Sequence, residues 1–103
     1  MMMELSVVIP TRNRRESLLR LLQSLSSQKY QLKEVIIVDA SDQEIDVAEL
    51  QAMFKSFPIR YLRSIASVCS QRNTGIKTAT SEFIFLCDDD IEITDDYLLT
   101  LMT

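Results

Sequence analysis

Short runs of branched and aromatic apolar residues recur along the chain and are separated by stretches with helical spacing. Runs of this kind, bounded by turn residues, are typical of buried β-strands. The pattern predicts four strands, over residues 5–9, 34–38, 59–62 and 83–87.

The stretches between these runs predict helices, because their apolar residues recur three and four positions apart. The clearest is a set of leucines between residues 18 and 25, preceded by Asn13 and Glu16 as an N-terminal cap signal. Three more helices are expected: about residues 46–54, about residues 70–80 with Ile76 and Ala79 facing inward, and a last one capped by Thr94.

Strict alternation of strand and helix predicts an α/β fold with parallel strands and right-handed crossovers. We expect a Rossmann-like, doubly wound sheet of four strands in the order 3-2-1-4, with helices on both faces. The charge of Arg60 inside the third run indicates an edge strand. This order leaves the apolar fourth strand as the other edge, which favours a truncated domain and self-association through that strand.

Composition excludes several kinds of chemistry. The chain has 103 residues, enough for one domain, and its only glycine is Gly75. Glycine-rich phosphate loops are therefore impossible, and the absence of histidine excludes histidine bases and ligands. The net charge of −4, without a basic run, argues against nucleic acid as a partner.

The two cysteines, Cys69 and Cys87, lack metal-binding spacing and are interpreted as core thiols in a reducing compartment. No stretch has the pattern of a signal peptide or the length of a membrane span. We expect a cytoplasmic location, with any membrane association arising from parts of a longer protein.

Polar residues follow three of the predicted strands where ligands bind in open parallel sheets, beyond the carboxyl ends. Strand order brings these ends to one rim of the sheet. The segments are residues 10–13 (Pro-Thr-Arg-Asn), 39–42 (Asp-Ala-Ser-Asp) and 88–90 (Asp-Asp-Asp).

Three consecutive aspartates repel one another unless a cation or solvent offsets their charge. In an extended backbone, Asp88 and Asp90 project to one side and Asp89 to the other. Two hard oxygen ligands without histidine favour Mg²⁺ or Mn²⁺. The alternative is a solvated acidic turn.

For the other polar residues a functional and a purely structural interpretation are both open. Asp39 either accepts a hydrogen bond from a base or ribose, or is a turn acid. Arg72 either neutralises phosphate or is a surface arginine. Arg12, Arg14 and Arg15 are interpreted mainly as the solvated start of a helix.

Taken together, four ordered segments resemble family 2 glycosyltransferases of the GT-A fold. They look like the opening motif, the acidic end of the second strand, the Arg-Asn-x-Gly helix and the D-x-D metal motif of that family. These segments are residues 7–14, 35–42, 72–76 and 85–90.

The resemblance implies that residues 1–103 form the nucleotide-sugar-binding half of a transferase domain. Its donor would be a nucleoside-diphosphate sugar, most simply a UDP-sugar, and its acceptor a glycan, lipid or other hydroxyl compound. The general base would lie beyond Thr103, so the chain alone would transfer no sugar. The resemblance implies that Pro10, Thr11 and Asn13 line the base pocket and that Asp39 recognises the base. Arg72 would lie near the base or the diphosphate, and Asp89 would face the ribose. Asp88 and Asp90 would hold Mn²⁺ or Mg²⁺.

Two alternatives remain open. A phosphatase of the haloacid dehalogenase type also places D-x-D after an apolar strand, although there the motif normally opens the domain. A non-catalytic nucleotide-binding or interaction module would use the exposed fourth strand to pair with a partner.

Overall fold

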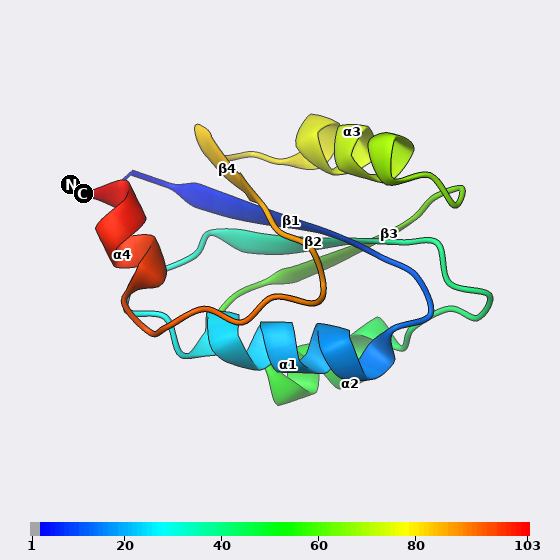
Figure 1. Cartoon of the computed structure of the whole chain (residues 1–103), viewed down its shortest axis with the longest axis horizontal. Helices are drawn as coiled ribbons and strands as arrows, with labels where there is room; N and C mark the ends of the chain where they lie inside the picture. The colour runs from blue at the N-terminus through cyan, green and yellow to red at the C-terminus, as the bar shows by residue number, and fades with distance from the viewer. Residues whose placement is uncertain (1–2) are drawn as a thin grey trace.

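The computed structural model describes residues 3–103, which form one four-stranded sheet covered by helices (Figure 1). Strand and helix alternate from one end to the other, as the hydrophobic pattern predicts. The elements are β1 (Leu5–Thr11), α1 (Arg15–Ser26), β2 (Glu34–Asp39), α2 (Val47–Met53), β3 (Ile59–Arg63), α3 (Val68–Thr78), β4 (Phe83–Leu86) and α4 (Tyr97–Met102).

The strand order is β3-β2-β1-β4 and every pairing is parallel. The predicted α/β class and 3-2-1-4 order are therefore confirmed. Helices α1 and α2 lie on one face of the sheet and α3 on the other, while α4 lies beside the start of β1 (Figure 1). A chain that winds this way brings the carboxyl ends of all four strands to one rim.

The two central strands are buried along their whole length, whereas the outer two are partly exposed. Helices on both faces leave no solvated side for β1 and β2, which explains their unbroken apolar sequences. Among the described residues β3 and β4 are the sheet edges, as predicted. Phe83 and Leu86 of β4 stay exposed.

The larger core lies between the sheet and α1, whose buried residues are Leu18, Leu21, Leu22 and Leu25. A smaller core, centred on Val8, Ile36 and Val38, lies on the α3 face. Alternate residues of a strand point to opposite faces, so Val7 belongs to the first core and Val8 to the second. Within residues 3–103, no helix has both the length and the apolar character needed to cross a membrane.

Helix α3 packs on the sheet through Gln71 and Gly75. A Cβ atom on Gly75 would overlap Val8, so the helix can approach the sheet only because this position is glycine. The predicted inward position of Ile76 is wrong, since its side chain is 41% exposed, while Ala79 does pack against the smaller core. Cys69 is exposed, so only Cys87 is a core thiol.

Two predicted helix caps are also wrong. Helix α1 has Arg14 at its N-cap, without a side-chain bond, because Asn13 instead adopts a left-handed conformation (φ 53°) and bonds to another loop. Helix α4 has Asp96 as its N-cap, and the Thr94 hydroxyl donates to Asp96 instead of capping the helix. The sequence predicted that Asn13 and Thr94 would cap these helices. Their side chains instead bond to Asp42 and Asp96, so neither is free to accept from a helix amide.

Candidate nucleotide and metal site

The loop after β1 and the acidic segment after β4 share one cavity at the carboxyl rim of the sheet. This acidic cavity has a volume of about 410 Å³. The pairing of β1 with β4 brings the two segments together. One residue beyond β4, the Cys87 amide donates to the Val8 carbonyl and so extends this pairing toward the aspartates. The cavity is lined by Pro10, Thr11, Arg12, Arg14, Val68, Gln71, Asp88, Asp89 and Asp90.

The three aspartates differ in exposure. Asp89 is buried and accepts a hydrogen bond from the Thr11 hydroxyl (2.8 Å). The side chains of Asp88 and Asp90 are 60% and 58% exposed. The backbone at Asp89 and Asp90 forms a turn and not the extended strand that the predicted alternation assumed, so the difference in exposure comes from the bond between Thr11 and Asp89.

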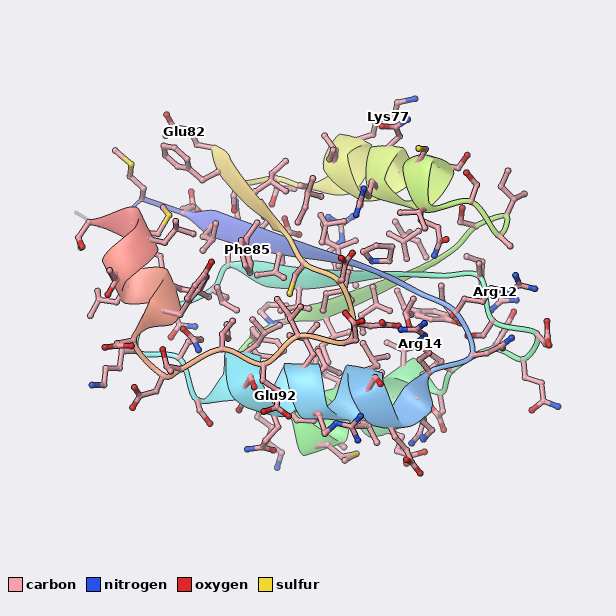
Figure 2. All side chains as sticks on the ribbon, in the orientation of Figure 1. Arg12, Arg14, Lys77, Glu82, Phe85 and Glu92 are labelled. Carbon is pink, nitrogen blue, oxygen red and sulfur yellow. The ribbon has the colours of Figure 1, made fainter. Side chains whose placement is uncertain are left out.

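Two arginines lie against these carboxylates. Arg14 Nη1 is 3.5 Å from Asp89 Oδ1 and 3.7 Å from Asp90 Oδ2, and Figure 2 shows its side chain extending toward the loop after β4. Arg72 lies outside the lining but donates to Asp88 Oδ1 (3.2 Å). Arginine therefore provides part of the charge compensation that the sequence argument assigned to a cation.

A buried amide holds the floor of the acidic cavity. Gln71 Nε2 donates to the carbonyl of Thr11 (3.0 Å) and to that of Val38 (2.9 Å). Both carbonyls lie near the carboxyl ends of their strands, and that of Thr11 also accepts from the Ala40 amide (3.0 Å). Helix α3 thereby fixes the relative positions of β1 and β2 at the rim.

Asp39 lies at the end of β2 and is completely buried. Its Oδ1 accepts from the amide (2.9 Å) and hydroxyl (2.5 Å) of Ser41. Its Oδ2 accepts from the hydroxyl of Tyr61 (2.5 Å) and from Arg63 Nη1 (2.9 Å). All four donors belong to the protein, so the carboxylate is held in one orientation.

Asn13 joins the loops after β1 and β2. Its backbone amide donates to Ser41 Oγ (2.7 Å), and its side chain exchanges two hydrogen bonds with Asp42. A second cavity of about 640 Å³, here called the loop cavity, lies between these loops. Its lining consists of Thr11, Asn13, Arg14, Arg15 and residues 41–46.

The predicted metal ligands have suitable chemistry but do not form a ready-made cage. Within residues 3–103 no three or more acidic, cysteine or histidine side chains converge on a metal position. Mg²⁺ commonly uses one or two carboxylates and completes its shell with water and phosphate oxygens, so exposed Asp88 and Asp90 fit such an ion. Burial, reinforced by the neighbouring aspartates, raises the pKa of Cys87 to about 12, so this thiol is protonated at neutral pH.

The structure thus brings Pro10, Thr11 and residues 88–90 into one cavity, with Arg72 beside it. Asn13 lies in the adjoining loop cavity, and Asp39 lies beneath the rim. The sequence did not indicate four residues that shape the site. One of them, Arg14, was predicted to be part of the solvated start of a helix. A parallel strand beside β2 could have indicated residues near Asp39, but the partners of a buried amide depend on tertiary packing. The missed residues are Arg14, Tyr61, Arg63 and Gln71.

Comparison with known proteins identifies related sequences over almost the whole chain. Residues 6–103 match the family model for glycosyl transferase family 2. An uncharacterized glycosyltransferase of Bacillus subtilis, YwdF, is 37% identical over 90 residues, which cover 85% of this chain and 33% of YwdF. The GalNAc(5)-diNAcBac-PP-undecaprenol beta-1,3-glucosyltransferase of Campylobacter jejuni is 30% identical over 105 residues, covering 98% of this chain and 34% of that enzyme. The chain spans about a third of the length of these curated relatives.

Solved structures share the fold. The crystal structure of S. aureus TarS 1-349 superimposes with a TM-score of 0.78 at 26% identity, over 96% of this chain and 31% of that one. TarS 1-349 in complex with UDP gives the same TM-score and coverage at 23% identity. These likenesses confirm the GT-A fold predicted from the sequence.

Proposed function

The chain belongs to glycosyl transferase family 2, and from this membership we propose that it binds the nucleoside-diphosphate sugar used by a longer glycosyltransferase. Residues 1–103 would form the nucleotide-binding half of that transferase domain. Family membership does not favour the phosphatase or the non-catalytic module. The observation that carries the proposal is the acidic cavity, where the end of β1 meets the aspartates after β4.

The proposed site places the nucleotide in the acidic cavity. Pro10 and Thr11 would line the nucleoside position, and Asp89, held by Thr11, would face the ribose. Asn13 would contribute to base recognition from the rim. Asp39, whose two oxygens already accept from Ser41, Tyr61 and Arg63, would contribute by holding the loop after β2 in place.

The diphosphate would lie toward the exposed carboxylates and the arginines. Asp88 and Asp90 would hold Mn²⁺ or Mg²⁺, which supplies positive charge against the diphosphate as the sugar departs. Arg72 would provide a further guanidinium for phosphate oxygens. The general base for the acceptor hydroxyl is not assigned to any residue of this chain, so the chain alone would transfer no sugar.

Calorimetric titration of UDP, GDP, CDP and ADP with and without Mn²⁺ tests this function. We expect binding that requires the metal and is lost in Asp90→Ala. Asp95→Ala is a matched control, because Asp95 is an equally exposed acid whose ion pair, to Lys29 at 3.9 Å, lies outside the cavity. Absence of binding, or binding independent of metal and of Asp90, would contradict the proposal.

The partners of the whole protein belong to the same proposal. UDP-sugar is the donor that we favour, since solved TarS structures of the same fold are complexes with UDP and UDP-GlcNAc. A glycan, lipid or other hydroxyl compound would be the acceptor. We place the reaction in the cytoplasm, and fractionation of cells expressing the longer protein tests that location.

A further inference from the structure

The Asp39 carboxylate has no acceptor position left for a ligand. Its two oxygens offer about four lone-pair directions. Ser41 fills two of them, and Tyr61 and Arg63 fill the others. With the side chain completely buried as well, Asp39 acts on a nucleotide through the groups that it holds.

Edge strand β3 supplies the long-range part of this network. The guanidinium of Arg63 donates with both terminal nitrogens: Nη1 to Asp39 Oδ2 (2.9 Å) and Nη2 to the Ser41 carbonyl (2.7 Å). The Tyr61 hydroxyl donates to Asp39 and accepts from the Ile45 amide (3.0 Å). Both ends of the loop after β2 are therefore attached to β3.

The Tyr61 hydroxyl stays a donor over the neutral range. Burial, together with its hydrogen bond to Asp39, raises the pKa of Tyr61 above its ordinary value. The Tyr61 hydroxyl consequently keeps its proton across the pH range in which nucleotide binding would be measured.

The fixed loop in turn fixes the loop after β1. Ser41 Oγ accepts from the Asn13 amide, and the Asn13 side chain bonds to Asp42. Asn13 stands between Thr11 and Arg14, the two residues that line both cavities. A path of hydrogen bonds thus runs from β3 to Asn13, whose chain neighbours Arg12 and Arg14 line the acidic cavity.

We propose that Tyr61 and Arg63 are positioning residues for nucleotide binding, which hold Asp39 and through it the loops that carry Thr11 and Arg14. The inference rests on the proposed function, because it concerns the same cavity. It assigns to β3, which touches neither cavity, a part in the shape of the nucleotide site.

Arg63→Met and Arg60→Met form a matched pair for the test. Both arginines belong to β3 and bind a buried carboxylate, Asp39 at 2.9 Å and Glu34 at 3.1 Å, but at opposite ends of the strand. Their side chains are 38% and 43% exposed. We expect Arg63→Met to weaken binding of UDP with Mn²⁺ by about tenfold, as loss of a charged hydrogen bond implies. Arg60→Met should lower the melting temperature while changing UDP affinity less than twofold.

Tyr61→Phe, which removes one hydroxyl from a side chain that otherwise keeps its packing, gives a second test at lower risk to folding. It should weaken UDP binding about threefold and speed amide hydrogen exchange in residues 40–45, with β1 and β2 unchanged. Equal effects of Arg63→Met and Arg60→Met on UDP affinity, or an unaltered affinity in Arg63→Met and Tyr61→Phe, would overturn the inference. A native chain that binds no nucleoside diphosphate would instead refute the proposed function, and the inference with it.

Discussion

The Thr11 hydroxyl donates a 2.8 Å hydrogen bond to the buried Asp89 carboxylate, across 78 residues of sequence. Their strands, β1 and β4, are neighbours in the sheet, so the bond fastens the acidic segment to the end of β1. Asp88 and Asp90, the chain neighbours of Asp89, stay exposed. The orientation of the two proposed metal ligands therefore depends on a threonine that is not itself a ligand.

Thr11→Val should loosen this segment. Removing the donor leaves a buried charge with one partner fewer, at a cost of about 1–3 kcal/mol in the free energy of unfolding. We also expect weaker Mn²⁺-dependent UDP binding, measured by calorimetry. Thr11→Ser keeps the hydroxyl and should retain most of the stability and most of the UDP affinity. A Thr11→Val variant with the stability and UDP affinity of the native chain would show that the bond has no such role.

Arg14→Gln should raise the affinity for Mn²⁺ in the absence of nucleotide. Arg14 lies against Asp89 and Asp90 and competes with a cation for their charge. Exposed ion pairs contribute up to about 1 kcal/mol, so the expected gain is at most about fivefold, measured by paramagnetic titration.

Arg15→Gln is the control for this experiment. It removes the same charge one residue away, but Arg15 pairs with Glu49 at 2.8 Å, outside the acidic cavity. Its Mn²⁺ affinity should match that of the native chain. An equal gain in both variants would mean that only net charge matters, not the position of Arg14.

Glu34 should make folding sensitive to acid. Burial by itself would raise its pKa, but hydrogen bonds from Ser6, Thr80 and Arg60 outweigh burial and lower it from 4.5 to about 2. A lowered pKa stabilises the fold above pH 4.5, and the contribution is lost as the pH falls toward 2. The difference corresponds to at most about 3 kcal/mol.

Urea unfolding of the native chain and Glu34→Gln at pH 7 and pH 3 measures this contribution. The variant should be less stable at pH 7 and should lose less stability than the native chain on acidification. Glu49→Gln, which alters an exposed ion pair, should leave the pH profile unchanged. Parallel profiles for the native chain and Glu34→Gln would contradict the assignment.

Gly75→Ala should destabilise the chain, although alanine is the better helix former by about 1 kcal/mol. The added Cβ would overlap Val8 and lie 3.3 Å from Val38 Cγ2. Overpacking of this kind typically costs about 1–3 kcal/mol, measurable by urea unfolding. Combining Gly75→Ala with Val8→Ala should recover part of the loss, whereas simple additivity of the two losses would exclude the clash as the cause.

The exposed edge at β4 should promote self-association. Phe83 lines an apolar groove of about 310 Å³ together with residues of β1 and α4. We expect light scattering to show a mass that rises with concentration, and Phe83→Lys to suppress the rise. Met53→Lys, at an exposed position of α2, should not suppress it. A native chain that stays monomeric at all concentrations would contradict this expectation.

The sequence by itself determined the class of fold, the strand order and the family. Apolar runs mark the strands because β1 and β2 must be buried on both faces, and the charge of Arg60 marks an edge. Residues 88–90 could be singled out because consecutive charges after a buried strand are costly without compensation. The fold class rests on the residue pattern within short segments, and the family on the order of four such segments along the chain.

Tertiary structure alone decided which polar groups meet. Asparagine is a common N-cap residue, yet Asn13 bonds to Asp42 in another loop. Ile76 has the apolar spacing expected of a core residue, yet it is Gly75 that faces the sheet. Arg63 reaches Asp39 only because parallel pairing sets them in register. Such choices depend on distances between segments far apart in sequence, and local periodicity carries no information about those distances.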